Sequence, residues 1–193
     1  MSKMGLRSKM GMKKLSLGLV LFGFALASCE PTNPFNTGPK YDTEANLAID
    51  RVKINEFLAK AEIDSLYRIH DPSGVVVIVQ KEGSGSRPTS GSIVYTDYTG
   101  SLLESGSVFD TSIESVARDN NIYVEANKYV TFSFLVGGGN VITGWDIGFR
   151  RLRPGSKAKI IIPSPFGYRD QDNNDRIPPN SILVFDVNFK GID

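Results

Sequence analysis

Short apolar stretches recur along the second half of the chain, and several of them alternate apolar with polar residues. A period of two is typical of a β-strand that buries one face. The pattern predicts strands over residues 75–80, 93–98, 102–109, 132–136, 157–162 and 182–189. Residues 83–90, which are rich in Gly, Ser and Pro, and Gly100 predict turns between them. Consecutive short strands joined by turns favour an antiparallel sheet.

A short helix is predicted between two of these strands, directly after the three glycines at 137–139. Apolar residues then recur at intervals of three and four, which places them on one face of an α-helix. They are Val141, Ile142, Trp145, Phe149 and Leu152. Pro154 and Gly155 end the pattern. We therefore expect a helix over residues 141–152 that lies against the sheet.

A second helix is predicted nearer the N-terminus, beginning at Asp42 or Thr43, either of which can cap it, and running to about Ala61. Its apolar stripe consists of Leu47, Ile54, Phe57, Leu58 and Ala61. This stripe can pack on the chain's own domain or pair with that of a second copy. Packing on its own domain is the simpler interpretation, and with it we expect a monomer. The lone histidine, His70, is expected in the loop that follows.

These elements predict an α+β fold: four or more antiparallel strands, one short helix and two further strands form a half-barrel with that helix on its concave face, preceded by a separate N-terminal helix. The predicted domain spans residues 73–193, after an N-terminal helix and linker at 42–72. Two connections are long. Residues 111–128 are expected to form one helical turn, ended by Asp119, Asn120 and Asn121, and residues 163–180 a polar loop.

The first 28 residues have the features of an export signal. Lys13 and Lys14 precede a mostly apolar run at 15–27, which is too short for a comfortable membrane span. The only cysteine, Cys29, then follows Leu26-Ala27-Ser28, a sequence that looks like a bacterial lipobox. The alternatives are a buried thiol at Cys29 or a signal that the ordinary peptidase removes.

We favour the lipoprotein interpretation, because the single cysteine stands where the motif requires it. Residues 1–28 are then a lipoprotein signal peptide, Cys29 carries the lipid, and residues 29–41, rich in Pro and small polar residues, are a flexible tether. This arrangement predicts a membrane-anchored protein of the cell envelope that faces the periplasm.

Charge and composition exclude several classes of function. Without the first 28 residues, 17 Lys and Arg face 21 Asp and Glu, a net charge of −4, which argues against nucleic acid as a partner. The body has one His and no Cys, so no nucleophile and base arrangement is recognisable. The glycines at 137–139 and Gly144 fit neither a dinucleotide fingerprint nor a phosphate-binding loop. We expect no cofactor.

Calcium is considered because Asp170, Asp172 and Asn174 mimic the first ligands of an EF-hand loop. Asp175 replaces the turn glycine, however, and Ser181 replaces the bidentate glutamate. We therefore expect a solvated loop and no metal site. What remains is an apolar, aromatic site with a few hydroxyls and one carboxylate, which is typical of a binding pocket.

Six blocks resemble, in order, the signature blocks of the FKBP-type peptidyl-prolyl cis-trans isomerases. They are VYTDYTG at 94–100, VFDTS at 108–112, FSF at 132–134, VITGWD at 141–146, IPSPFGY at 162–168 and IPPNSILVF at 177–185. The resemblance covers residues 75–191. With the signal peptide, the chain is similar to the lipoprotein members of Gram-negative bacteria, some of which are associated with gliding motility.

The resemblance implies a five- or six-stranded antiparallel half-barrel sheet wrapped around the short helix. A proline of an exported polypeptide would enter the pocket between the two, and the protein would assist the folding of that polypeptide. The residues it assigns to catalysis are Tyr98, Phe109, Asp110, Trp145 and Tyr168, with Trp145 as the floor. The residues it assigns to substrate binding are Phe132, Val141, Ile142, Ile177 and Phe185. Tyr168 would donate its hydroxyl to one substrate carbonyl and the backbone N–H of Ile142 would bind another.

Two departures from the family pattern keep an alternative open. Arg169 replaces the glycine that usually follows the tyrosine, and Arg176 stands where an apolar residue often lines the pocket. Both favour a catalytically weak or inactive peptide-binding module of an envelope assembly. Retention of the five residues assigned to catalysis favours the enzyme. A small-molecule carrier has weaker support.

Overall fold

The computed structural model describes residues 40–171 and 175–193, which include all the predicted elements except the export signal and tether. The first element is helix α1, Thr43–Lys60. The side chain of Asp42 caps it by accepting a hydrogen bond from the Ala45 N–H at 2.9 Å. The predicted N-terminal helix is therefore confirmed nearly to the residue. No helix within the described residues is long and apolar enough to span a membrane.

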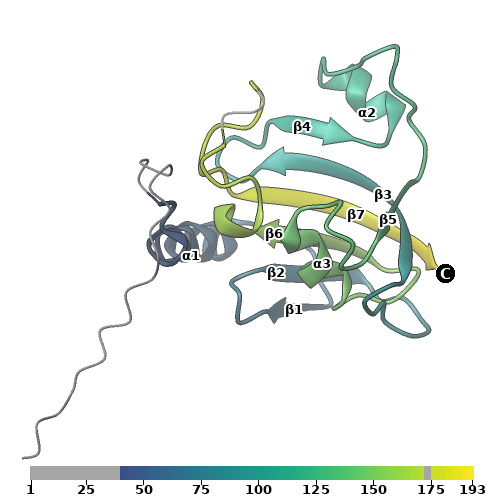
Figure 1. Ribbon diagram of the computed structural model, residues 1–193, viewed down its shortest axis with the longest axis horizontal. Helices are drawn as coiled ribbons and strands as arrows, with labels where there is room; N and C mark the ends of the chain where they lie inside the picture. Colours follow the sequence, from purple (N-terminus) through teal and green to yellow (C-terminus); the bar gives the residue numbers. More distant parts are fainter. Residues whose placement is uncertain (1–39, 172–174) are drawn as a thin grey trace, which may run out of the picture. The chain divides into compact units, whose positions relative to one another are not determined.

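The body is an antiparallel sheet of seven strands (Figure 1), one or two more than predicted. The strands are β1 Tyr67–His70, β2 Val76–Lys81, β3 Ile93–Leu102, β4 Val108–Thr111, β5 Phe132–Leu135, β6 Lys157–Ile162 and β7 Leu183–Ile192. Their order is β1-β2-β6-β7-β3-β4, and β5 pairs with β3 beside β4. Helix α2, Glu114–Asp119, lies in the predicted excursion between β4 and β5, and α3, Thr143–Phe149, follows β5.

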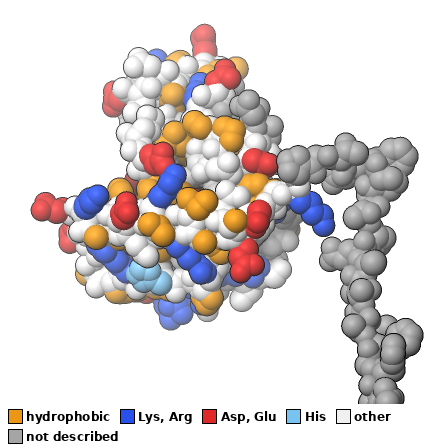
Figure 2. All heavy atoms as spheres, turned by 90° about the vertical axis from the view of Figure 1, so that its left-hand side faces the viewer, with side chains coloured by type: hydrophobic (Ala, Val, Ile, Leu, Met, Phe, Trp, Pro, Cys, Tyr) orange, Lys and Arg blue, Asp and Glu red, His pale blue; other side chains and the backbone are white. Residues whose placement is uncertain are grey.

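The added strand is β1, which pairs with β2 from Tyr67 opposite Val79 to His70 opposite Val76. His70 therefore ends a strand, and its predicted place in a loop is wrong. Three of the four residues of β1 are exposed, so the segment lacks the clear alternation that marks the other strands. The histidine, the pale blue side chain in Figure 2, lies at the surface.

The turn predicted at Gly100 is also wrong, because β3 continues through it to Leu102 and the turn lies at residues 103–107. Position 100 requires a glycine because a side chain there would clash with its neighbours, and not because the backbone turns. A Cβ there would lie 2.6 Å from Phe109 Cζ and 2.8 Å from Phe185 Cε1. Pairing with β4 shifts register between Gly100 and Ser101. The glycine thus admits two aromatic rings over the strand.

The two faces of the sheet bury separate cores, and β2 contributes to both. Val77 and Val79, together with Val75 just before the strand, belong to the core that contains Trp145 and Phe149 of α3. Val76 and Ile78 belong to the core on the opposite face, where Ile54 of α1 is buried and Phe57 and Leu58 pack against it. An apolar run without alternation is expected of a strand covered on both sides. Helix α1 therefore packs on its own domain, as predicted.

Around α1, the exposed surface carries charges of both signs. Figure 2 views the side of the body that bears this helix, and Lys and Arg side chains are interspersed there with Asp and Glu. Ile49 and Val52 of α1 are exposed by 54% and 59%. The visible face has no large area of one charge sign, which is typical of an ordinary solvated surface.

Helix α3 is shorter than predicted, because it begins at Thr143, with Ile142 as its N-cap, and Arg150 is its C-cap. Val141, Ile142 and Leu152 lie outside the helix, yet all three pack with the same core. The spacing of three and four therefore identified core residues correctly but gave wrong helix bounds. Within the helix, Gly144 and Gly148 face Ile162 and Ile160 of β6.

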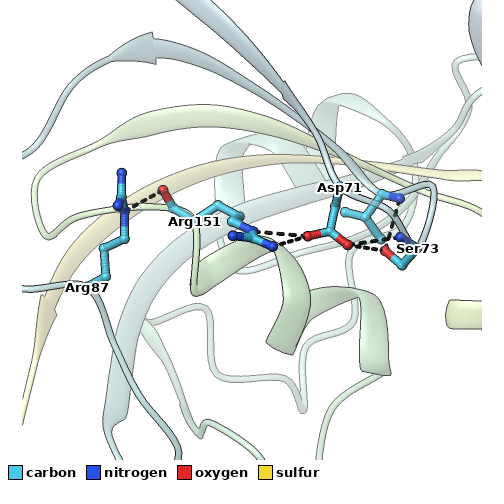
Figure 3. Close-up of polar contacts among 5 residues, drawn as sticks. Asp71, Ser73, Arg87 and Arg151 are labelled. Carbon is cyan, nitrogen blue, oxygen red and sulfur yellow. Dashed lines mark hydrogen bonds and ion pairs between the residues drawn. The ribbon is translucent and has the colours of Figure 1, made fainter.

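A polar cluster fixes the chain just after α3 to the turn between β1 and β2 (Figure 3). The guanidinium of Arg151 donates to Asp71, and its Nε lies 3.0 Å from Oδ2. The backbone and hydroxyl of Ser73 donate to Oδ1 at 3.0 and 2.8 Å. Arg87 in turn donates to the Arg151 carbonyl at 3.1 Å. Burial opposes ionisation of Asp71, but the hydrogen bonds from Ser73 and Arg151 outweigh it and lower its pKa.

Gly144→Ala is expected to lower the free energy of unfolding by about 1–3 kcal/mol, the usual effect of overpacking a core. The new Cβ would lie 2.2 Å from Ile162 Cγ2, so the helix must move away from the sheet. Urea titration measures the change. Gly191→Ala is the control, since nothing lies within 4 Å of a Cβ there. Equal stabilities for the two variants would contradict the close approach of α3 to β6.

Candidate functional site

Trp145 of α3 lies at the centre of an aromatic cluster between the helix and the sheet. Its ring meets Tyr98 of β3 at 5.1 Å, Phe132 of β5 at 5.6 Å and Phe185 of β7 at 5.2 Å between centroids, each close to edge-to-face. Phe109 of β4 meets Phe185 at 5.6 Å in the same manner. Such edge-to-face contacts are the preferred geometry of aromatic pairs. Strands far apart in sequence therefore bring their rings to one site.

A cavity of about 200 Å³ opens at this cluster. It is lined by Tyr98, Phe109, Asp110, Phe132, Asn140, Val141, Ile142, Trp145, Tyr168 and Phe185. Every residue predicted for the site except Ile177 is among them. Ile177 is 5% exposed and packs in the core that contains Trp145, so it does not line the cavity. Asn140 lines the cavity and was not predicted.

The polar side of the cavity is built on Asp110. Its Oδ2 accepts a hydrogen bond from the Tyr98 hydroxyl at 2.6 Å, and its Oδ1 accepts from the Thr111 N–H at 2.8 Å. Burial, and then the hydrogen bond to Asp110, raise the pKa of Tyr98 strongly. Burial and the charge of Asp110 also raise the pKa of Tyr168. Both phenols are therefore neutral near pH 7 and able to donate.

Two donors at the cavity have no acceptor within residues 40–171 and 175–193. The hydroxyl of Tyr98 is directed to Asp110, but that of Tyr168 makes no hydrogen bond to a described residue. The N–H of Ile142, the residue that caps α3, likewise has no backbone acceptor in this part of the chain. A ligand with two carbonyl groups can therefore be held by a side-chain and a backbone donor without displacing an existing bond.

Tyr168 is held in place from the opposite side of the sheet. The short helix η1, Ser164–Phe166, precedes it, and the Ser164 carbonyl accepts from the N–H groups of Gly167 and Arg169 at 3.0 Å each. Asp50 of α1, which is 3% exposed, accepts from both the backbone N–H and the hydroxyl of Ser164 at 2.7 Å. The structure thus links the N-terminal helix to the segment that carries Tyr168.

Sequence reasoning did not identify Asp50. The available signal was its position, because it lies three residues after Leu47 and four before Ile54, inside the apolar stripe of the helix. A carboxylate at a buried helix position needs a hydrogen-bonding partner. The partner itself, a serine more than 100 residues later, was not evident from the chain.

The two arginines that departed from the family pattern do not line the cavity. Arg169 has a φ of 58°, a left-handed conformation in which glycine is favoured, and its guanidinium lies 5.9 Å from the ring centroid of Tyr41. Arg176 is exposed, and its Nη1 lies 3.4 Å from the Phe109 carbonyl oxygen. Neither guanidinium contributes to the cavity wall.

Metal binding has no visible support in the part of the chain that is described. No group of three or more His, Cys, Asp or Glu side chains is placed to hold an ion there. The calcium-like segment falls partly on residues 172–174, which lie outside the described residues, as do the export signal, Cys29 and most of the tether.

Comparison with known proteins agrees with the residue blocks and the fold. Residues 84–190 match the model of the FKBP-type peptidyl-prolyl cis-trans isomerase family. The chain is similar to a probable FKBP-type peptidyl-prolyl cis-trans isomerase, FkpA, of Neisseria meningitidis, with 35% identity over 149 residues. That alignment covers 77% of this chain and 47% of the relative, so the chain spans about half the relative's length.

A smaller relative is covered more fully. FK506-binding protein 1 of Saccharomyces cerevisiae is 39% identical over 100 residues, which are 52% of this chain and 75% of that protein. Among solved structures, FkpA from Escherichia coli is similar with a TM-score of 0.56 and 28% identity, covering 77% of this chain and 60% of that one. Because the family match extends over more than half of its residues, the chain belongs to the FKBP-type peptidyl-prolyl cis-trans isomerases.

Proposed function

We propose that this protein catalyses cis-trans isomerisation of the peptide bond before proline in polypeptides, within the aromatic cavity. The observation that carries the proposal is the composition of that cavity, in which six aromatic residues and two aliphatic side chains surround a space with two donors that have no acceptor among the described residues. An apolar cavity of about 200 Å³ suits a proline ring, and the donors suit the carbonyl groups on either side of it.

The chemistry requires no covalent step. Resonance holds the planar amide behind a barrier of about 18–20 kcal/mol, and the twisted amide has lost that resonance together with much of its C–N dipole. A cavity that solvates charge separation poorly therefore binds the twisted state better than the planar one. This difference in binding is what lowers a barrier. The side chains that such a mechanism needs are rings and donors, which are the groups present.

A protease-coupled assay on prolyl tetrapeptides tests the activity directly. The purified chain should accelerate the cis to trans step, which takes about 10–100 s without a catalyst. The alternative, a peptide-binding module without activity, is favoured if no prolyl peptide is turned over while peptides still bind. Neither of the two arginines lines the cavity, which supports the active form over this alternative.

Tyr168→Phe is expected to lower kcat/KM a few-fold, equivalent to about 0.5–1.5 kcal/mol for one hydrogen bond. The substitution keeps the ring and, of the two tyrosine hydroxyls at the cavity, removes the one that is not directed to Asp110. The same tetrapeptide assay measures it. Tyr95→Phe is the control, because the Tyr95 hydroxyl donates to Asp193 at 2.7 Å, away from the cavity. Equal activity of the two variants would remove Tyr168 from the mechanism.

We propose further that the protein acts in the cell envelope as a lipoprotein, on exported polypeptides. Support comes from the sequence: the apolar run at 15–27, the lipobox-like residues before Cys29, and the Pro-rich residues that follow. A protein tethered beside the membrane would meet unfolded chains as they emerge, before slow prolyl bonds have isomerised.

Cys29→Ser is expected to abolish labelling of the protein by radioactive palmitate and to release it from the membrane fraction. The reason is that lipidation requires this thiol, the only one in the chain. Fractionation and autoradiography of cells that express each form provide the measurement. Labelling that persists in the variant would exclude the lipoprotein interpretation and leave the isomerase proposal untouched.

A further inference from the structure

A second and larger cavity, of about 460 Å³, adjoins the aromatic one. The two cavities share three wall residues, Tyr98, Asp110 and Phe132. The remaining wall of the larger cavity comes mainly from the excursion between β4 and β5, including Lys128, Tyr129 and Val130. A ligand that fills the aromatic cavity can therefore extend directly into the larger one.

The excursion that forms this wall is packed against itself. Arg118 of α2 pairs with Glu114 and lies 3.6 Å from the ring centroid of Tyr123. Tyr123 stacks on Tyr129 with 5.4 Å between ring centroids, and the Tyr129 hydroxyl accepts from the Val124 N–H at 2.9 Å. The Tyr123 ring and the Val124 backbone N–H thus hold the Tyr129 side chain in position. These contacts give this wall of the larger cavity a defined conformation.

Around Tyr129, the backbone makes no hydrogen bond to other described parts of the chain. The N–H and C=O groups of Lys128, Tyr129 and Val130 make no backbone hydrogen bond within the described residues, and pairing with β3 begins only at Phe132. Val130 is 63% exposed. Three consecutive residues with free backbone groups at a cavity offer an incoming chain the bonds of a β-ladder. Because backbone groups are common to all sequences, such a wall binds an extended polypeptide whatever its side chains.

We propose that the larger cavity is a subsite for the extended, unfolded polypeptide that flanks the proline, held by the backbone of residues 128–130. This inference rests on the proposed function, since the proline in the aromatic cavity gives the flanking chain its position. It specifies the substrate class of the site. Long unfolded chains gain contacts that a prolyl tetrapeptide does not reach, so they should have the higher kcat/KM.

The test compares two substrates with the full chain and its variants. One is a prolyl tetrapeptide, and the other is an unfolded protein whose refolding is limited by prolyl isomerisation. Val130→Pro removes an N–H from the wall and Val130→Asp adds a charged side chain to it. We expect Val130→Pro to lower the ratio of kcat/KM for the unfolded protein to that for the tetrapeptide about three- to tenfold, as the loss of one backbone bond implies. Val130→Asp keeps the N–H and should lower the ratio to a similar extent, because the bound chain would cover its charge.

Val124→Asp is the control, because Val124 is 40% exposed on the same excursion but does not line the cavity. The ratio should stay at the wild-type value in this variant. An unchanged ratio in both Val130 variants, or an equal fall in Val124→Asp, would overturn the subsite. Circular dichroism shows whether each variant is folded.

A binding measurement separates this proposal from the proposed activity. Fluorescence anisotropy with a labelled, permanently unfolded polypeptide reports affinity without turnover. If the wild-type chain isomerises neither substrate, the proposed activity fails, yet the subsite is still supported by a three- to tenfold weaker affinity of the Val130 variants. Affinity equal to wild type in those variants overturns the subsite even if both substrates are turned over.

Discussion

Trp145→Ala is expected to lower the free energy of unfolding by about 3–5 kcal/mol, the usual result of deleting a buried Trp or Phe ring. The Trp145 side chain is only 4% exposed. Its ring lies 5.1–5.6 Å from the ring centroids of Tyr98, Phe132, Phe134, Phe149 and Phe185. Alanine would leave the edges of these rings without a partner, and α3 and the sheet cannot close the gap, because Gly144 and Gly148 already bring them into contact.

Urea unfolding followed by far-UV circular dichroism measures this change, since the variant has lost the only Trp and with it the fluorescence probe. Leu66→Ala is the matched control, because Leu66 is 64% exposed and its truncation should cost little. A loss below about 1 kcal/mol in Trp145→Ala would mean that the ring does not support the core. A loss of 3–5 kcal/mol takes much of the 5–15 kcal/mol typical of a domain, so kinetics of the variant must be normalised to its folded fraction.

The sequence predicts the strands best where they are buried on one or both faces. Strand β6, Lys157–Ile162, matches the prediction to the residue, because alternation and β-branching act together there. β1 was missed because an exposed strand at the sheet edge carries little hydrophobic signal. Its pairing with β2 depends on tertiary contacts that the local sequence does not indicate. Local propensity therefore identifies interior strands and fails at edges.

The errors at Gly100 and at the bounds of α3 both arose because one sequence pattern is compatible with two different structures. A glycine indicates that a side chain is not tolerated, but sequence alone does not say whether the cause is backbone conformation or space. At Gly100 the cause is space for Phe109 and Phe185. At α3, the spacing of Val141, Ile142 and Leu152 correctly marked burial, although extended residues before the helix and a turn after it supply that burial equally well.

Except for Asn140, the residues that line the aromatic cavity lie within the family blocks, so their gathering could be predicted, while their roles in binding and catalysis stay a prediction. Ile177 belongs to a block but packs in the core, since a signature motif preserves the fold as well as the function. The larger cavity could not be predicted, because its wall is formed by the excursion at 112–131, whose structure depends on the packing of Arg118, Tyr123 and Tyr129. Asp50 lies outside every family block, and its role as a hydrogen-bond acceptor is evident only from its contact with Ser164.

Asp50→Ala is expected to lower both the stability of the fold and the activity. It removes the acceptor of the Ser164 N–H and hydroxyl, both buried, and Ser164 is 0% exposed. A buried donor left without an acceptor costs about 1–3 kcal/mol. The Ser164 hydroxyl can instead turn toward the Tyr41 hydroxyl oxygen, which is 3.2 Å away, so only the N–H loses its acceptor fully. We therefore expect a loss of about 2–4 kcal/mol in the free energy of unfolding.

The activity of Asp50→Ala should fall as well, because Ser164 holds the segment that carries Tyr168 to the cavity. We expect kcat/KM, corrected for the folded fraction, to fall at least as far as in Tyr168→Phe, that is a few-fold. Ile54→Ala is the control. Ile54 lies one turn later on the same face of α1 and is 2% exposed, so its truncation should destabilise by about 2–5 kcal/mol without touching Ser164.

The comparison of these two variants decides what α1 does. If Asp50→Ala loses activity per folded molecule and Ile54→Ala does not, Asp50 is a positioning residue for Tyr168, and the helix belongs to the functional unit of the enzyme. Asp50→Asn should then recover most of the activity, because its amide oxygen can still accept from Ser164. Equal activity in the alanine variants, once each is corrected for its folded fraction, would show that α1 contributes stability to the sheet and leaves Tyr168 where it is.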